Sequence, residues 1–365
     1  LTDGPGWRWI FFINLPFGIL TVLMAMAFLP PDRDRTWGDE QGRPLRPEGQ
    51  QRRVDWTGIA LLAAGLGSLQ VVLEQGHQYD WLDNGGIRLL SLLAAAALPA
   101  FVWWELRCRA PAVDLRVLRH RSLAAGSLFS LVLGMGLYGT VFVVPIFAQT
   151  VLQYTATQTG LLMLPGALAS ALTMAVLGRN ARRFDPRHLI VLGAVAMVVT
   201  MLQLASLGPD TGEHSLFWPL IFRGVTTVTM FLPLSLAALG PLPKADVGAG
   251  SGFFNLMRQL GGTFGIAVLT VVLDHQRAVH RSQLVQHLAS TNPLLQERLQ
   301  ALTSLTAGRR DEALQLLSLQ VDRQAALLAY GDVFRLVALV FLLAIPLVLL
   351  LGRPETPEEA VAEPA

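Results

Sequence analysis

Charged residues and cysteine are both scarce in this sequence. Only 15% of the 365 residues are charged, whereas a soluble domain carries roughly a quarter. Hydrophobic residues make up 52% of the chain, and this composition excludes an ordinary soluble fold. The single cysteine, Cys108, has no second cysteine with which to form a disulfide or a CxxC metal site. We therefore interpret Cys108 as a loop residue without a redox or metal-binding function.

The motifs of common enzymes and ATP-driven pumps are also absent. The chain contains no phosphate-binding P-loop, no HExxH metal-binding pair and no GxSxG nucleophile elbow. No Asp, Glu or His lies in the middle of a long apolar block, although a proton-driven carrier needs a titratable group in or near its pathway. We therefore expect no enzymatic activity, no cofactor, no metal site and no proton-coupling carboxylate within this chain.

Long apolar blocks dominate the chain. Nine of them approach or exceed the ~20 residues with which an α-helix crosses ~30 Å of hydrocarbon. The blocks are Trp9 to Leu29, Val54 to Leu73, Ile87 to Trp104, Ser122 to Ala148, Gln158 to Gly178, His188 to Leu207, Leu216 to Leu239, Val247 to Leu273 and Val333 to Leu351. The sequence therefore predicts an all-α polytopic membrane protein with nine spans in the lipid bilayer.

Arginines alternate between the loops that join these blocks. Three segments are rich in arginine: residues 30–53, 105–121 and 179–187. Three other loop segments contain neither Lys nor Arg: residues 74–86, 149–157 and 208–215. Each of them is one apolar block away from an arginine-rich segment. Because basic loops stay in the cytoplasm, the three arginine-rich segments should be cytoplasmic. Counting the spans onward from these segments places the acidic C-terminal tail, residues 352–365, in the cytoplasm as well. The formal charge of +2 and the pI near 9.0 then reflect orientation in the membrane, not a nucleic-acid partner.

The longest polar stretch, residues 274–332, should lie on the outer side of the membrane. Leu and Ala recur every three or four residues within it, a pattern that predicts short amphipathic helices. These helices are expected at Ser282 to Leu288, Leu294 to Leu305 and Ala313 to Leu328. The segment is either a docking surface for a periplasmic adaptor protein or a solvated helical loop without a partner.

Arg258 is the strongest candidate for a functional residue. It lies roughly midway along Val247 to Leu273, and a charged group inside lipid costs at least a few kcal/mol. Polar or small residues share its helical face at spacings of three and four: Ser251, Asn255, Gln259 and Gly262. The opposite face carries larger apolar residues: Phe253, Met257, Leu260 and Phe264. Arg258 therefore either faces a watered cavity or is satisfied by backbone carbonyls without a role in transport.

A second group of candidates lies on three other spans. Arg223 is followed on the same face by Thr226, Thr227 and Met230, but snorkelling toward the outer interface explains it almost as well. Tyr138 and Phe142 could form an aromatic wall, although the glycines around them are also typical of close helix packing. The candidate substrate cavity contains these residues: Tyr138, Phe142, Met163, Thr227, Met230, Asn255, Arg258 and Gln259.

The first 18 residues, LTDGPGWRWIFFINLPFG, resemble the segment between the fifth and sixth helices of a known transporter family. This family comprises the 14-helix drug:proton antiporters of the major facilitator superfamily, of the EmrB/QacA type. Further similar segments follow in order: residues 54–76, 111–122, 159–190 and 250–269. The resemblance implies an incomplete major facilitator fold. The implied parts are helix six in residues 1–29, two central helices in 54–104 and a C-terminal six-helix bundle in 122–351.

The resemblance also implies a function and a location. The parent protein is expected to export amphipathic or cationic small molecules from the bacterial inner membrane by proton antiport and alternating access, and so to confer antibiotic resistance. The proton-coupling acids belong to N-terminal helices that this chain is expected to lack as a fragment. A cytoplasmic gating loop is implied at these positions: Gly178, Arg179, Arg183, Pro186 and Arg187. Two alternatives remain open, an exporter of one narrow substrate and a truncated membrane protein without transport activity.

Overall fold

The computed structural model describes most of the chain. The described residues are 8, 12–28, 55–79, 81–108, 111, 113–180, 184–208, 213–243, 246–286, 288, 293–306 and 309–351. Every regular element among them is a helix. Eight of these helices are long and apolar enough to cross a membrane, and a shorter apolar helix, α2 (Asn14–Phe28), precedes them. The all-α polytopic fold is confirmed: eight of the nine predicted spans correspond to these long helices, and the first corresponds to the shorter α2.

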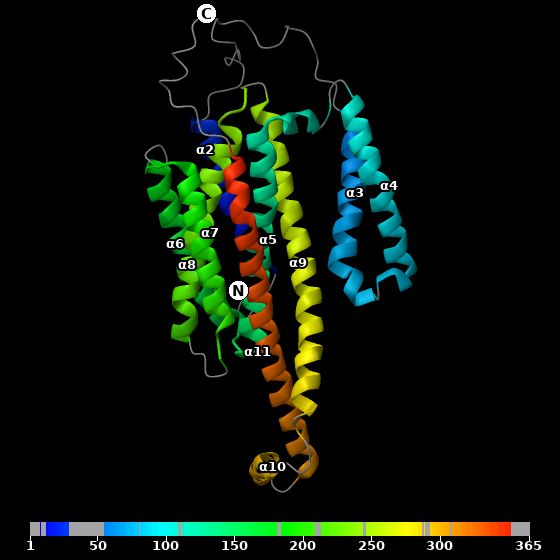
Figure 1. Ribbon diagram of the computed structural model, residues 1–365, viewed down its shortest axis with the longest axis vertical. Coiled ribbons are helices and arrows are strands. Elements are labelled where there is room, and N and C mark those ends of the chain that lie inside the picture. The colour runs from blue at the N-terminus through cyan, green and yellow to red at the C-terminus, as the bar shows by residue number, and fades with distance from the viewer. Residues whose placement is uncertain are drawn as a thin grey trace, which may run out of the picture.

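Six of the long helices pack against one another in one bundle, which Figure 1 shows. They are α5 (Arg121–Thr150), α6 (Ala156–Asn180), α7 (Pro186–Ala205), α8 (Glu213–Leu239), α9 (Val247–Gln286) and α11 (Arg310–Ala344), which continues into the short η6 (Ile345–Leu350). The core contains five fully buried phenylalanines: Phe129, Phe147, Phe254, Phe334 and Phe341. Helix α5 lies among the others. Half of its apolar, membrane-spanning stretch is buried, whereas only 11% of the corresponding stretch of the peripheral α6 is buried.

Glycines bring α5 and α9 into close contact. A Cβ atom added at Gly265 of α9 would lie 2.7 Å from the Cα atom of Met135 in α5, closer than real atoms approach. Gly261 likewise meets the backbone of Leu131, and Gly134 of α5 meets the backbone of Arg258. Because no side chain separates the two backbones, the rotation of α9 about its axis is set by this contact.

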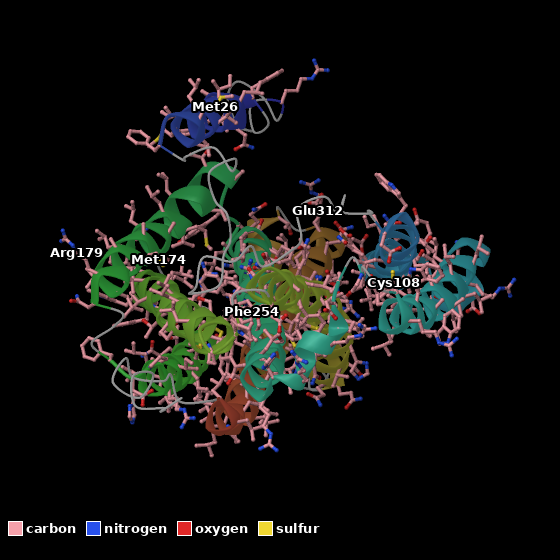
Figure 2. All side chains as sticks on the ribbon, turned by 90° about the horizontal axis from the view of Figure 1, so that it is seen from above. Met26, Cys108, Met174, Arg179, Phe254 and Glu312 are labelled. Carbon is pink, nitrogen blue, oxygen red and sulfur yellow. The ribbon has the colours of Figure 1, made fainter. Side chains whose placement is uncertain are left out.

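The two central helices, α3 (Trp56–Gln75) and α4 (Gly85–Arg107), form a hairpin beside the bundle, where α3 packs against α9. The carboxylate of Asp55 caps α3 by accepting a hydrogen bond from the backbone N–H of Gly58 at 2.9 Å. It also accepts from the indole N–H of Trp104 in α4 at 3.0 Å, so one residue ties both helices together. Cys108 follows α4 as its C-terminal capping residue, in this hairpin (Figure 2).

Helices α9 and α11 extend past the other helices of the bundle (Figure 1). Helix α9 has 40 residues, which at 1.5 Å per residue is about twice the ~30 Å hydrocarbon thickness. The prediction of separate short helices near Ser282 and Ala313 is therefore wrong, whereas α10 (Pro293–Leu305) matches the predicted helix at Leu294 to Leu305. Neither Gly nor Pro interrupts residues 274–286 or 310–330, and adding residues to a helix is easier than starting a new one. We call residues 274–286, α10 and residues 310–332 the extended hairpin.

The helices begin and end at the two ends of the bundle in the alternating order that the arginine content of the loops predicts. The start of α5, the end of α6 and the start of α7 lie at one end of the bundle, and α10 lies beyond the other end (Figure 1). Seen from above, α2 lies apart from the bundle, and none of its residues is buried (Figure 2). The predicted cytoplasmic loop at 30–53 and the tail at 352–365 lie outside the described residues. Which end faces the cytoplasm stays a prediction.

Candidate functional site

The candidate site lies where α5, α8 and α9 meet. Gly262 of α9 leaves space that the ring of Tyr138 from α5 occupies, since a Cβ atom at Gly262 would overlap that ring. Arg258 lies one helical turn before Gly262, and Asn255 lies about one turn before Arg258. The structure therefore places Arg258 and Asn255 on one face of α9, as the sequence predicted, and brings the ring of Tyr138 from α5 next to that face.

The side chain of Arg258 is half-buried and held by two uncharged neighbours. Its Nη2 atom donates a hydrogen bond to Oδ1 of Asn255 at 3.0 Å. Its guanidinium carbon lies 5.1 Å from the centroid of the Phe231 ring in α8, in the geometry of a cation–π contact. The Nε atom is buried and has no hydrogen-bond partner among the described residues. The position of the guanidinium is therefore defined, but its charge is not neutralised by these contacts.

Arg223 is a second guanidinium in the bundle, and it is more deeply buried. Its exposed fraction is 8%, so the snorkelling alternative is wrong: the side chain points into the bundle, not toward the interface. Its Nη1 atom donates to Oγ1 of Thr140 in α5 at 3.3 Å, and the Thr140 hydroxyl donates to the carbonyl of Gly136 at 2.6 Å. Within the described part of the chain, neither Arg223 nor Arg258 forms an ion pair.

The other predicted cavity residues divide into two groups. Tyr138 and Phe142 are exposed on the same side of α5, and Thr227 is half-buried with its hydroxyl donating to the carbonyl of Arg223. Met230 does not face an open surface, because it is fully buried where Gly193 of α7 approaches it.

The side chains of Met163 and Gln259 have other surroundings than Arg258. Met163 is half-buried against the hydrophobic core. Gln259 lines a cavity of about 240 Å³ between α3 and α9, together with Leu260 from the predicted apolar face. On the side of α9 that α3 covers, a residue of the predicted polar face and one of the predicted apolar face therefore line the same cavity. The two faces of α9 are not separated there as the sequence predicted.

Phe231 is the residue that the sequence did not single out. It lies four residues after Thr227 on the same face of α8 and places its ring under the guanidinium of Arg258. That spacing is a signal that sequence reasoning could have used, but an apolar residue in an apolar span does not stand out. Its role depends on a contact between two different helices.

The residues of the implied gating loop have different surroundings. Gly178 has open space around it, and the exposed side chain of Arg179 points away from the bundle (Figure 2). Pro186 begins α7, and Arg187 donates a hydrogen bond to the carbonyl of Leu351, which follows η6. Arg183 lies outside the described residues. Of this set, Arg187 ties the start of α7 to the end of the last span.

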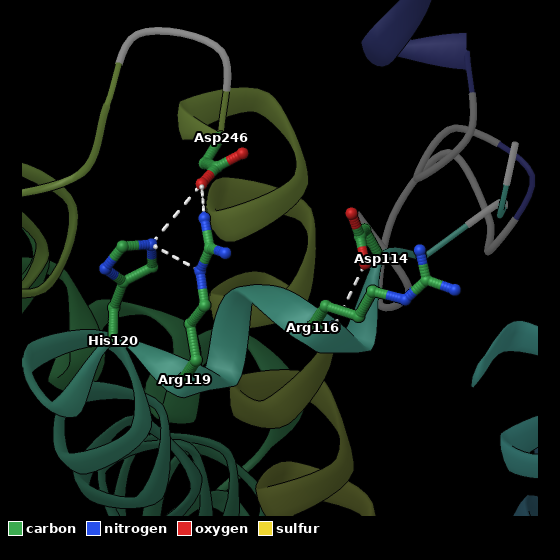
Figure 3. A network of polar contacts seen from close by, with 5 residues as sticks. All are labelled: Asp114, Arg116, Arg119, His120 and Asp246. Carbon is green, nitrogen blue, oxygen red and sulfur yellow. Dashed lines mark hydrogen bonds and ion pairs between the residues drawn. The ribbon is translucent and has the colours of Figure 1, made fainter. Parts of the chain in front are cut away.

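A polar network that the sequence did not predict lies at the same end of the bundle (Figure 3). Asp246, just before α9, is 3.3 Å from Nε2 of His120 and 3.5 Å from Nη2 of Arg119. These two residues end the loop that precedes α5, so the network joins the starts of α5 and α9. Arg119 is 72% exposed, and the ion pair is therefore worth little stability. Among the described residues, no group of His, Cys, Asp and Glu could hold a metal ion.

Comparisons with known proteins place this helical, arginine-containing bundle in a transporter class. The profile of the Major Facilitator Superfamily matches residues 1–266, and the chain belongs to this family. Multidrug export protein EmrB of Escherichia coli (strain K12) is 30% identical over 351 residues, which cover 95% of this chain and 65% of EmrB. Fatty acid resistance protein FarB of Neisseria gonorrhoeae is 26% identical over 349 residues, covering 95% of this chain and 66% of FarB.

The chain thus spans just under two thirds of the length of these relatives. Among solved structures, a bacterial homologue of the human lysosomal transporter Spinster aligns with a TM-score of 0.47 at 14% identity. That alignment covers 81% of this chain and 70% of the other. The resemblance to drug antiporters of this superfamily is confirmed by the family match and the EmrB relatives. Eight long apolar helices and bacterial transporter relatives indicate a multi-span protein of the bacterial inner membrane.

Proposed function

We propose that the protein exports amphipathic small molecules across the inner membrane by alternating access, in exchange for protons. The observation that carries the proposal is the pair of guanidinium groups, Arg223 and Arg258, inside a transporter bundle without a described carboxylate partner. A charged side chain within a membrane span is expensive and is usually retained for a function. The names of the relatives support this direction, since EmrB is a multidrug export protein and FarB a fatty acid resistance protein.

The substrate would bind near the middle of the membrane, against the side of the bundle that carries Tyr138, Phe231 and Arg258. In transporters built from two helix bundles, sites of this kind lie between the bundles, which rock around the substrate. The chain would supply one bundle and part of the cavity, and the rest of the cavity would come from N-terminal helices. Phe142 and Thr227 would extend the surface along α5 and α8.

The arginine-rich end of the bundle would hold it together during rocking. Arg187 links α7 to Leu351, and Asp246 links α9 to Arg119 and His120. These contacts join elements from the beginning and the end of the bundle, which is a requirement for movement as a rigid body. We propose that this end is cytoplasmic and that the extended hairpin projects on the outer side, where it offers a surface for a periplasmic adaptor.

Proton antiport requires a titratable group, and none of the described residues in the middle of a span is acidic. We propose that the coupling carboxylates belong to N-terminal helices that pack against this bundle. The chain expressed alone should then bind substrate weakly at most and should not couple efflux to protons. Proton movement that depends on substrate, in liposomes with this chain alone, would contradict this assignment.

The test of the proposed function is efflux by the complete protein in bacteria from which the resident drug pumps have been deleted. The protein should lower the accumulation of amphipathic dyes, and collapse of the proton gradient should abolish the effect. A protein that lowers the accumulation of one compound class alone would be the narrow exporter. No change for any compound at normal membrane abundance would contradict export and favour the alternative of a membrane protein without transport activity.

A further inference from the structure

A guanidinium that is fixed in position but not neutralised is suited to binding an anion. Arg258 has this character, because its two contacts, Asn255 and the ring of Phe231, carry no net charge. We propose that these three residues form a subsite for the carboxylate or sulfonate head of an amphipathic organic anion. The inference rests on the proposed export function, since it names the substrate class of the same cavity.

The contacts of Arg258 fix the orientation of its guanidinium plane. The amide nitrogen of Asn255 donates to the carbonyl of Ser251 at 3.1 Å, so the amide oxygen is turned toward Arg258. Phe231 supports the guanidinium at 5.1 Å from the ring centroid. An arginine offers five N–H donors in a planar fork, and Asn255 uses one of them. The Nε–H is buried, so the N–H groups that remain on the two Nη atoms are the ones that suit the two oxygens of a carboxylate, which arginine binds in a bidentate manner.

The position of Arg258 allows contact with a molecule that lies outside the bundle. Its neighbour Asn255 is exposed, and the side chain of Arg258 itself is half-buried, whereas the backbone of Arg258 is packed against Gly134 of α5. The exposed ring of Tyr138 lies one turn further along α9. An amphipathic molecule with its head at Arg258 can therefore place its apolar part along Tyr138 and Phe231. The same surface combines a charged recognition element and aromatic contacts.

The charges in the surrounding helices favour an anion over a cation. Arg223 lies in α8, two turns before Phe231, and carries a second positive charge at 8% exposure. No described residue in the middle of a span is acidic, and charges interact more strongly in a low-dielectric interior than in water. A cation beside Arg258 meets a guanidinium of its own sign, and the buried Arg223 adds a second positive charge in the neighbouring helix. The bundle should therefore prefer anions, which Arg258 attracts, to cations.

A carboxylate for Arg258 could also come from the protein itself, as a side chain on another helix of the complete transporter. The two sources differ in what the loss of Arg258 does. If the carboxylate belongs to the substrate, removal of the guanidinium impairs anion transport and spares cations. If it belongs to the protein, removal leaves a buried carboxylate without its partner and impairs transport of every substrate.

The experiment compares two fluorescent probes with the same apolar group, pyrenebutanoate and (pyrenylbutyl)trimethylammonium. Their uptake is measured in inside-out membrane vesicles that contain the complete protein at matched abundance. The wild type should transport the anion in preference to the cation. Arg258→Gln should lower anion transport about tenfold or more, as expected for the loss of a charged hydrogen bond. Because it removes a charge of the same sign as the cation, it should leave cation transport unchanged or raise it. Arg258→Lys, which keeps the charge, should keep the anion preference at reduced transport.

Arg310→Gln provides the matched control, because Arg310 is exposed in the extended hairpin, away from the α5–α8–α9 contact. It removes one positive charge and should leave transport of both probes unchanged. Unaltered anion transport in Arg258→Gln overturns the inference, and so does an equal loss for both probes. Preserved cation transport shows that a variant is folded, and the lysine variant supplies the test if Arg258→Gln does not accumulate. Failure of the wild type to transport either probe contradicts the proposed function itself.

Discussion

Basic side chains have different surroundings in the bundle and in the extended hairpin. In the hairpin, Arg281 pairs with Asp322 at 2.6 Å and His280 with Asp332 at 2.7 Å, and all four side chains have access to solvent. In the bundle, Arg223 and Arg258 have hydroxyl, amide and aromatic neighbours and no ion pair among the described residues. Exposed ion pairs cost little and join two helices, whereas unpaired charges in a span are expensive. From this difference we propose that the bundle charges serve the function of the protein and that the hairpin charges serve its structure.

The largest expected effect is on whether an introduced cysteine is accessible to a thiol reagent outside the cell, for which the outcome is labelling or no labelling. In a Cys108→Ala background, a cysteine at the exposed Gln300 of α10 should react with an impermeant thiol reagent applied to intact cells, because the extended hairpin should project outward. A cysteine at the exposed Arg116, at the other end of the bundle, should not react until the cells are opened. Labelling of Arg116→Cys in intact cells would reverse the proposed orientation.

The next effect is on export and compares the two kinds of arginine directly. Arg258→Ala should reduce efflux of anionic dyes about tenfold or more, because a charged hydrogen bond in a cavity contributes ~1.5–3 kcal/mol. Arg281→Ala removes an exposed ion pair and should change the same efflux less than about twofold. Efflux is measured at matched membrane abundance. Equal effects of the two variants would remove the functional distinction between bundle and hairpin.

A smaller effect concerns the stability of the bundle. Thr140→Val keeps the shape of the side chain but removes the described acceptor of Arg223, so it should lower the free energy of unfolding by about 1–3 kcal/mol. Thr200→Val is the control, because the Thr200 hydroxyl donates only within its own helix, to the carbonyl of Ala196 at 2.8 Å. The measurement is the thermal unfolding of the purified protein. A cost for Thr140→Val that does not exceed the control would show that Arg223 does not depend on this contact.

The smallest effect lies in the central hairpin, where the cap of α3 should respond to pH. Burial raises the pKa of Asp55, but hydrogen bonds from Gly58 and Trp104 outweigh it and hold the pKa below its ordinary value of 3.8. A lowered pKa in the folded state means that the stabilisation is present at neutral pH and is lost as the pH falls through that pKa. Asp55→Ala should therefore cost about 1 kcal/mol at neutral pH.

The loss of stability caused by Asp55→Ala should disappear in acid. The Asp55 side chain of the wild type is protonated there and no longer contributes as a charged cap. Thermal unfolding of wild type and variant at a series of pH values measures this directly. Asp114→Ala, at an exposed cap of the short helix before α5, serves as the comparison. A cost that stays constant down to the lowest pH would assign the role of Asp55 to packing, not to its charge.

The spans were predictable from the sequence, and the extended hairpin was not. The predicted block Gln158 to Gly178 lies within α6, and the block Leu216 to Leu239 lies within α8. An apolar block ends where polar residues begin, but a helix ends where capping or helix-breaking residues stop it. Because no such residue follows Leu273 until after Gln286, α9 continues into the polar segment.

The candidate site was predictable only within single helices. The contact between Arg258 and Asn255 follows from their spacing of three residues in α9, and the structure contains it. The contact with Phe231 and the burial of Met230 depend on how α8 is rotated against α5, α7 and α9, which no spacing within α8 reveals. Arg223 was visible as a charge in a span, but not the side toward which it points.

The sequence by itself determined that the protein is helical, where its membrane helices lie and that two arginines fall inside them. The reason is local: the length of an apolar block and the cost of a charge in lipid do not depend on the rest of the fold. The tertiary structure decided which side of each helix faces the interior. Backbone contact at the glycines of α5 and α9 sets the rotation of α9, and only this rotation places Arg258 over Phe231.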